Sequence, residues 1–213
     1  MTALCTNGLP VQRRLYKQRQ MWVYNRVMSR IEQINYVFET VSRRLPEAGI
    51  GFLMIGGHAV NHYGYTRATM DVDFMIAAED VSTVRQVMKD AGFTNVSEGE
   101  TVIFFSLPDS PVRVDFLPVD TGTLEQLLSG AVQVKYGGAS LKVPCLLDLL
   151  AMKLFALKGG HPRRKDRDAA DIVHLIAENG LTAETDLKPL CERYATTRIY
   201  EELAARIREM KNA

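Results

Sequence analysis

The chain has 213 residues, of which 46% are apolar, and a formal net charge of +1 at pH 7. This is enough apolar sequence for one domain with a sizeable core and some helical additions. No apolar run approaches the roughly 20 residues that a membrane-spanning helix needs. Three widely spaced cysteines, an odd number, argue against a disulfide framework, so we expect a cytoplasmic protein with no membrane contacts.

Helices are predicted where apolar residues recur at helical spacing, and strands where short apolar runs lie between turn residues. The predicted helices cover 11–45 (as one helix or two), 58–63, a segment from Asp80 or Ser82 to Ala91, 123–128, 146–157 and 164–178, with one or two more over 183–211. The predicted strands cover 52–55 and 71–77, followed by a hairpin of 101–107 and 111–116 and a small hairpin over 133–143. This pattern predicts an α+β fold in which helices back a small mixed β-sheet.

Three regions follow from this order of elements. Residues 1–48 are predicted to form an N-terminal helical extension, 49–145 the core that carries the sheet, and 146–213 a C-terminal helical portion. Basic residues outnumber acidic ones in 1–45, which is typical either of an RNA-binding surface or of solvated helix faces.

Two carboxylates lie close together on the predicted strand 71–77. Side chains alternate between the faces of a strand, so Asp71 and Asp73 point the same way, while Val72 and Phe74 point into the packing. Two adjacent carboxylates repel each other unless a cation lies between them, and Mg²⁺ is commonly held by one or two carboxylates together with substrate phosphates. The alternative is a solvated edge strand.

A glycine pair, Gly56-Gly57, follows the predicted strand 52–55 and precedes a short helix. Glycine lets the backbone approach a ligand closely, and the start of a helix offers free N–H groups to an anion. An ordinary turn without a ligand is the alternative. A phosphate-binding turn next to a metal-binding pair of carboxylates would favour phosphoryl or nucleotidyl transfer.

A third carboxylate strengthens this interpretation. Asp115 shares one face of its predicted strand with Arg113 and Leu117, and the other face is apolar. Burying an aspartate among β-branched residues is costly unless it is paired or coordinates a metal, although an edge strand facing water is also consistent with the pattern.

The order of Gly56-Gly57, Asp71-x-Asp73 and a later strand aspartate, Asp115, resembles the polymerase-β-like nucleotidyltransferase superfamily. Within it, the stretch GGHAVNHYGYTRATMDVDFMI is most similar to the minimal and AbiEii-type (toxin-like) bacterial nucleotidyltransferases. The resemblance extends over about residues 50–178 and implies a nucleotidyltransferase fold.

Two downstream segments also resemble this group. Leu149–Leu154 is similar to its basic helix, and Arg167–Ile172 to its KDxxD-type helix, with Arg167 in place of the usual lysine. Lys165 lies two residues earlier, so the choice between these two basic residues for contact with the nucleotide stays open. Asp168 and Asp171 lie one turn apart and can orient basic side chains by ion pairing.

The resemblance implies an enzyme that transfers a nucleoside monophosphate from an NTP to a hydroxyl and releases pyrophosphate. Asp71, Asp73 and Asp115 would be both the catalytic residues and the ligands of one or two Mg²⁺ ions, with Asp115 as general base. The expected nucleotide-binding residues are Gly56, Gly57, Arg67, Lys153, Lys165 and Arg167.

The acceptor and partners are expectations of the same kind. The resemblance implies an RNA acceptor, such as a tRNA 3′ end, or a protein hydroxyl, and a toxin with a cognate antitoxin. Two alternatives stay open: a catalytically silent module that has kept the fold and binds a partner, and a nucleotidyltransferase acting on a small molecule such as an antibiotic.

Overall fold

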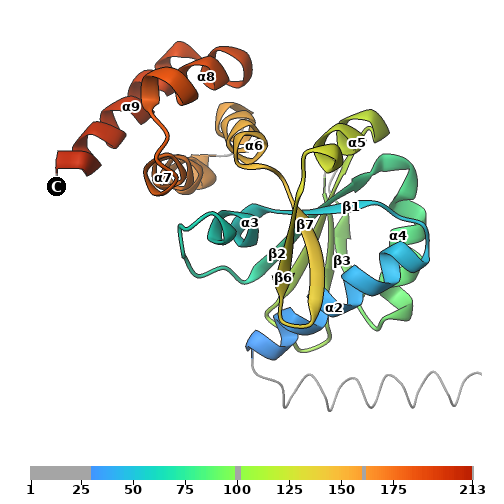
Figure 1. Cartoon of the computed structure of the whole chain (residues 1–213). Coiled ribbons are helices and arrows are strands. Elements are labelled where there is room, and N and C mark those ends of the chain that lie inside the picture. The colour runs from blue at the N-terminus through green and yellow to red at the C-terminus, as the bar shows by residue number, and fades with distance from the viewer. Residues whose placement is uncertain (1–29, 99–101, 160–161, 213) are drawn as a thin grey trace, which may run out of the picture. The chain divides into compact units, whose positions relative to one another are not determined.

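The computed structural model describes residues 30–98, 102–159 and 162–212 (Figure 1). The predicted helix over 11–45 therefore lies partly outside the described residues, as does all of 1–29. In the described part, no helix is both long and apolar enough to cross a membrane.

The described chain contains helices, strands and short helical turns in an α+β order. The helices are α2 (Arg30–Glu47), α3 (Gly56–His62), α4 (Val81–Asp90), α5 (Thr121–Ser129), α6 (Leu146–Gly159), α7 (Pro162–Glu178), α8 (Lys188–Tyr194) and α9 (Thr197–Asn212). The strands are β1 (Phe52–Ile55), β2 (Asp71–Ala77), β3 (Thr94–Glu98), β4 (Ile103–Ser106), β5 (Arg113–Val119), β6 (Val132–Tyr136) and β7 (Ala139–Val143). A 3₁₀ turn, η1 (Ala78–Asp80), precedes α4, and a π-helical turn, η2 (Ala183–Leu187), precedes α8.

The strands form a sheet of order β1-β2-β5-β4-β3 and a separate hairpin of β6 and β7. β2 pairs with β5 in parallel, whereas β5 with β4 and β4 with β3 are antiparallel. The sheet is therefore mixed, which confirms the predicted fold class.

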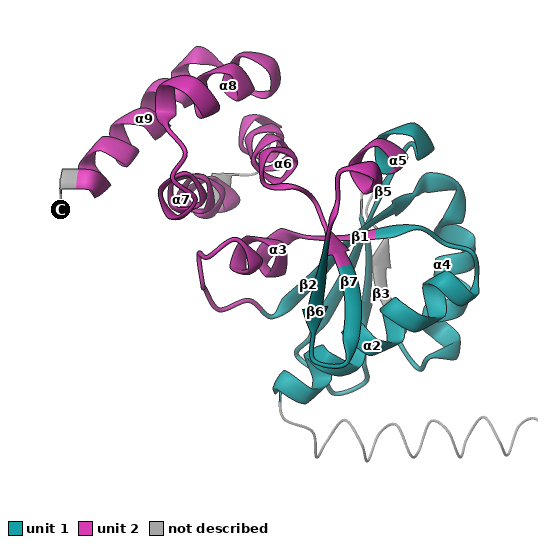
Figure 2. Cartoon of the chain, in the orientation of Figure 1, with its two compact units in different colours: residues 1–52, 70–124, 133–141 teal, residues 53–69, 125–132, 142–213 magenta. Residues whose placement is uncertain are grey.

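The structure divides into two compact units (Figure 2). Unit 1 comprises residues 1–52, 70–124 and 133–141, and unit 2 comprises 53–69, 125–132 and 142–213. The predicted division at residues 48 and 145 was drawn from the order of elements and stays a prediction.

The core of unit 1 lies on the apolar side of β2 and β5. Phe74 and Phe116 are fully buried neighbours with ring centroids 5.5 Å apart, and Phe105 meets Phe116 edge-on at 5.8 Å. Aromatic pairs in these geometries add to the stabilisation that comes from burial alone. This packing fixes which face of each strand is left for polar side chains.

Unit 2 is mainly helical. α7 packs against α6 and α9, and α6 also packs against α8, so α6 and α7 form its centre. The sequence of α6 is apolar over most of its surface, as expected for a helix with neighbours on more than one side, and Leu150 and Leu154 are fully buried.

The sequence did not predict β3, whose residues Thr94–Glu98 are mostly polar and show no apolar alternation. β3 is an edge strand and, within the described residues, pairs only with β4. The register of this pairing shifts between Asn95 and Ser97. Edge strands of this kind are commonly polar and interrupted by a bulge, so a search for apolar periodicity misses them. The other predicted strands agree with the structure to within a few residues at their ends.

Candidate active site

The parallel pairing of β2 and β5 places four charged residues on one face of the sheet. Asp71 lies beside Arg113, and Asp73 lies beside Asp115. Residues that are side by side in a ladder point to the same face, and so do residues two apart on one strand. Asp71, Asp73, Asp115 and Arg113 therefore form a square, which we call the carboxylate square.

Arg113 is the basic residue of the carboxylate square and contacts Asp115 and Asp71. Its Nε lies 2.8 Å from Oδ1 of Asp115, and its Nη2 donates to Oδ2 of Asp115 at 2.8 Å. The same Nη2 lies 3.5 Å from Oδ2 of Asp71. The guanidinium also stacks over the ring of Phe104, 5.0 Å from its centroid, which holds it against the sheet.

Burial and the neighbouring carboxylates both act on the protonation of Asp115. The pKa of Asp115 is raised to about 6, first because the side chain is buried, and further because of the charges of Asp73 and Asp71; Arg113 opposes this rise without cancelling it. A buried carboxylate with an elevated pKa, next to other carboxylates, is typical of functional sites.

The square also suits a divalent cation by its chemistry. It offers carboxylate oxygens, the ligands that Mg²⁺ prefers, and three carboxylates with one guanidinium carry a formal charge of −2. Within residues 30–98, 102–159 and 162–212, however, no group of three or more His, Cys, Asp or Glu side chains has the arrangement of a metal site. The side chains as they stand are ordered around Arg113.

The glycine pair, which belongs to unit 2, forms a tight turn at the start of α3. Gly56 has a φ of 65°, in the left-handed region that favours glycine. A Cβ on Gly57 would lie 2.8 Å from Oγ1 and 2.9 Å from Cβ of Thr69, and 3.2 Å from Nη1 of Arg67. The backbone at Gly57 is therefore in close contact with the loop that carries Arg67.

This loop is held to α3 by Asn61. The side-chain amide of Asn61 donates to the carbonyl oxygen of Arg67 at 3.0 Å, and its Oδ1 accepts from the N–H of Arg67, also at 3.0 Å. Nearby in α3, burial and the charge of Arg67 lower the pKa of His58 to about 4. His58 is therefore neutral at neutral pH and adds no charge beside the glycine pair.

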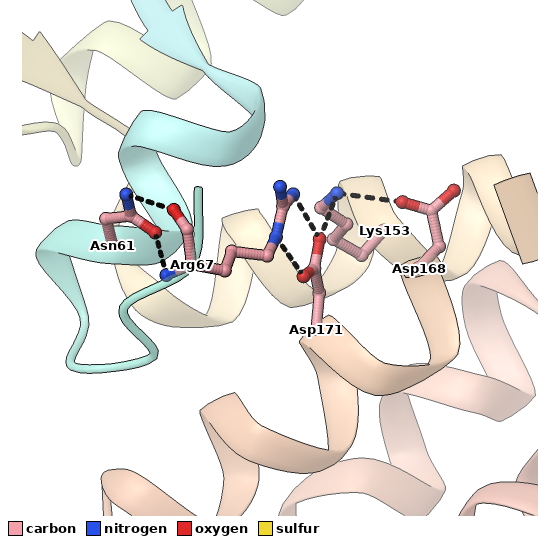
Figure 3. A network of polar contacts seen from close by, with 5 residues as sticks. All are labelled: Asn61, Arg67, Lys153, Asp168 and Asp171. Atoms are coloured by element: carbon pink, nitrogen blue, oxygen red, sulfur yellow. Dashed lines mark hydrogen bonds and ion pairs between the residues drawn. The ribbon is translucent and has the colours of Figure 1, made fainter. Parts of the chain in front are cut away.

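Arg67 and Lys153 meet in a partly buried network with two aspartates of α7, shown in Figure 3. Nε and Nη2 of Arg67 donate to the two carboxylate oxygens of Asp171 at 2.7 and 2.9 Å. Nζ of Lys153 lies 2.7 Å from Asp171 and 2.8 Å from Asp168. This confirms that the two aspartates orient basic side chains by ion pairing.

The network is balanced, with two basic and two acidic side chains. Asp171 is fully buried, which by itself would raise its pKa, yet its hydrogen bond from Arg67 and the charge of Lys153 lower the pKa below its ordinary value. The bidentate geometry is the strongest form of an arginine–carboxylate pair. The third nitrogen of the Arg67 guanidinium, Nη1, takes no part in these two hydrogen bonds with Asp171. It lies next to Gly57.

The structure does not place all of the predicted basic residues together. Arg67 and Lys153 are joined through Asp171, whereas the side chains of Lys165 and Arg167 are exposed on α7. Lys165 lines a groove next to α9. Sequence reasoning also missed the role of Arg113, although its position two residues before Asp115, on the same strand face, was a usable signal.

Comparisons with known proteins support the same fold. An antigenic nucleotidyltransferase-like protein from Paracoccidioides brasiliensis has a similar structure, with a TM-score of 0.54 and 20% identity over 85% of this chain and 89% of that one. The antibiotic-resistance factor ANT(2″)-Ia, solved in complex with adenylyl-2″-tobramycin, gives a TM-score of 0.52 and 12% identity over 86% of this chain and 99% of that one. At these identities the likeness shows the fold alone.

A search of curated proteins found no match. The family model described as "Nucleotidyl transferase AbiEii toxin, Type IV TA system" matches residues 42–212, which include the glycine pair, the carboxylate square and the Arg67–Lys153 network. The chain therefore belongs to the AbiEii nucleotidyltransferase toxin family.

Proposed function

We propose that this protein transfers a nucleoside monophosphate from an NTP to a hydroxyl acceptor, with release of pyrophosphate, and that it acts as the toxin of a toxin–antitoxin pair. The observation that carries the proposal is the carboxylate square, in which three aspartates share one sheet face with a single arginine. Family membership supports the class of reaction.

Asp71, Asp73 and Asp115 would hold one or two Mg²⁺ ions. When bound, the metal would neutralise charge on the triphosphate and on the oxygens that attack and leave. The residues of the square fit this role because they supply carboxylate oxygens, the ligands that Mg²⁺ prefers, on one face of the sheet. The remaining tasks fall to the protein, since nucleotidyl transfer needs mainly alignment and charge neutralisation.

Asp115 is the residue we assign to proton transfer. A general base works best when its pKa lies near the pH at which the enzyme operates, and the pKa of about 6 places Asp115 closer to neutrality than an ordinary aspartate. Arg113 holds both oxygens of Asp115 and so fixes the orientation of this carboxylate. The proton of the acceptor hydroxyl would pass to Asp115.

The glycine pair and Arg67 are the proposed phosphate contacts. Gly56 is half-buried at the start of α3, whereas Gly57 is buried against the loop, with Nη1 of Arg67 beside it. Asp171 and Lys153 would act through Arg67 by holding its guanidinium in place, which makes them positioning residues. We keep Arg167 as a candidate nucleotide contact on α7.

The acceptor is either RNA, such as a tRNA 3′ end, or a protein hydroxyl. The decisive experiment incubates the protein and Mg²⁺ with each α-labelled NTP in turn, together with total RNA or lysate protein. We expect label in one macromolecular fraction and its absence with the Asp73→Ala variant. If no fraction takes up label with any NTP, the protein is a silent member of the family; label in a small-molecule fraction would instead indicate an antibiotic-type acceptor.

A second experiment separates binding from transfer. Asp115→Asn keeps the size of the side chain but removes the charge that accepts a proton. We expect NTP affinity within several-fold of wild type, and a transfer rate lower by at least the roughly 10²-fold typical of a lost general base. Titration calorimetry with a non-hydrolysable NTP, run beside the transfer assay, measures both. Loss of binding, with unchanged transfer per bound nucleotide, would place Asp115 in the nucleotide pocket.

A further inference from the structure

A groove lies in unit 2 along the end of α6, the first half of α7 and α9, helices that are labelled in Figure 1 and belong to the magenta unit of Figure 2. Its volume is about 470 Å³. The floor is apolar and consists of Leu157, Ala169 and Leu203, which are buried, with Ile199 half-buried beside them. The groove is large enough for a small organic group, because ligand pockets start at roughly 300 Å³.

The rim of the groove is strongly charged. It carries four basic residues, Lys158, Lys165, Arg198 and Arg206, and two acidic residues, Asp166 and Glu202. Both acidic residues are already paired: Glu202 lies 3.0 Å from Nε of Arg198, and Asp166 lies 3.5 Å from Nη2 of Arg206. Each arginine thus has a carboxylate partner.

The two lysines have no such partner. Among the residues that the structure describes, neither Lys158 nor Lys165 makes a hydrogen bond or an ion pair, and both are exposed. The rim therefore carries a formal charge of +2, with both unbalanced charges on lysines of α6 and α7. A lysine ammonium is a flexible point charge with three donors, which suits a phosphate oxygen.

This groove is separate from the Arg67–Lys153 network, although α7 contributes to both. Successive residues of a helix are about 100° apart, so Lys165 and Ala169 point to one side of α7, and Asp168 and Asp171 to another. Asp168 and Asp171 face Lys153, as Figure 3 shows. A ligand in the groove would therefore leave the side chains around Arg67 undisturbed.

We propose that this groove binds a single-stranded segment of RNA, with phosphates at Lys158 and Lys165 and a base against the apolar floor. A row of phosphates alternating with flat apolar bases matches an unbalanced basic rim over an apolar floor. The floor contains no aromatic ring, so base stacking is absent and binding should depend little on sequence. The inference rests on the proposed function, because it names RNA as the acceptor class.

The test measures RNA binding directly, without NTP or metal. Fluorescence anisotropy of a 5′-labelled single-stranded 20-mer RNA is followed over a series of salt concentrations, with the full-length protein and its variants. Lys158→Ala/Lys165→Ala should weaken binding about tenfold and reduce the slope of log K against log salt by roughly 0.7 per lysine. The matched control is Lys135→Ala/Lys188→Ala, which removes two exposed lysines outside the groove and should leave affinity within about twofold.

A variant that is expected to bind RNA more tightly excludes misfolding as the cause of weaker binding in the lysine variant. Glu202→Gln removes the partner of Arg198 and raises the charge of the rim by one. It should strengthen binding about threefold and steepen the salt dependence. If the lysine variant behaves like its control, or if Glu202→Gln weakens binding, the inference is wrong.

Competition identifies the class of ligand. Poly-glutamate at equal charge concentration should displace the labelled RNA poorly; equal displacement would assign the groove to an acidic protein instead. The two proposals fail in different ways. If the lysine variant loses RNA binding but the wild type transfers no nucleotide, the proposed activity is wrong and the groove assignment holds. If the wild type transfers nucleotide to protein and the lysine variant binds RNA unchanged, the activity holds and the groove assignment is wrong.

Discussion

The carboxylate square of unit 1 and the Arg67–Lys153 network of unit 2 are built from the same kinds of side chain but differ in charge balance. The square has three aspartates around one arginine, and the pKa of Asp115 is raised to about 6. The network has two aspartates with one arginine and one lysine, and the pKa of Asp171 is lowered. Burial acts in the same direction on both carboxylates, so their partners cause the difference.

This comparison separates two uses of buried charge. A balanced group such as the network holds its members in one geometry, and removing a single partner leaves a buried charge without compensation. The square contains more carboxylates than basic side chains, so a cation that binds there would stabilise it.

The largest expected effect is on activity. Asp73→Ala should reduce nucleotide transfer to background, by at least roughly 10³-fold, because it removes a proposed metal ligand. Asp90→Ala is the matched control, since Asp90 is an exposed aspartate on α4. Near-wild-type activity of Asp73→Ala at limiting Mg²⁺ would contradict the metal assignment. Circular dichroism checks that both variants are folded.

The next effect is on stability, and it concerns the network. Asp171→Asn leaves Arg67 without its carboxylate and Lys153 with only one, so the free energy of unfolding should fall by about 3–5 kcal/mol. Asp168→Asn should cost less, because Lys153 keeps Asp171. Urea unfolding measures both.

The pH dependence of this effect has a definite sign. Because the pKa of Asp171 is lowered in the folded state, its contribution is present above about pH 4 and is lost as the pH falls below that value. The difference between wild type and Asp171→Asn should therefore shrink in acid. A constant difference down to pH 3 would show that packing, and not charge, is responsible.

Removing a carboxylate charge from the square should raise the stability of the protein, whereas removing one from the network lowers it. In EDTA, Asp115→Asn should stabilise the protein by about 3 kcal/mol above pH 6, since the pKa of Asp115 is raised by roughly two units and each unit corresponds to about 1.4 kcal/mol. The native state binds more protons than the unfolded state between about pH 4 and pH 6, so wild type loses stability as the pH rises through this window. Thermal melts at pH 4 and pH 8 test this. A less stable variant at both values would show that Arg113 already compensates Asp115.

The smallest effect is expected at the glycine turn. Gly57→Ala would place a methyl group 2.8 Å from Thr69 and 3.2 Å from Arg67, so the loop has to shift. We expect a loss of about 1 kcal/mol in stability and a several-fold rise in KM for the NTP. Gly159→Ala is the control, because a Cβ added there would have no atom within 4 Å. Equal KM values for the two variants would remove Gly57 from the phosphate contacts.

Local patterns in the sequence were sufficient to predict part of the fold and part of the candidate site. The alternation in β2 placed Asp71 and Asp73 on one face, and the family motif connected them with Gly56-Gly57 and Asp115. These inferences succeed because side-chain direction within one element depends only on backbone periodicity. Most helices and strands were found for the same reason, whereas β3 has too weak a pattern to be recognised.

Only the tertiary structure decided which charges meet. Arg67 and Asp171 are 104 positions apart in sequence, and nothing local to either residue indicates that they form a bidentate pair. The register of β2 and β5 placed Arg113 beside Asp71 and Asp73 beside Asp115, and burial then raised the pKa of Asp115. The sequence by itself determined the faces and the chemical types of the site residues, because these are local properties. Their partners, burial and charge balance depend on packing between distant segments, which no short pattern encodes.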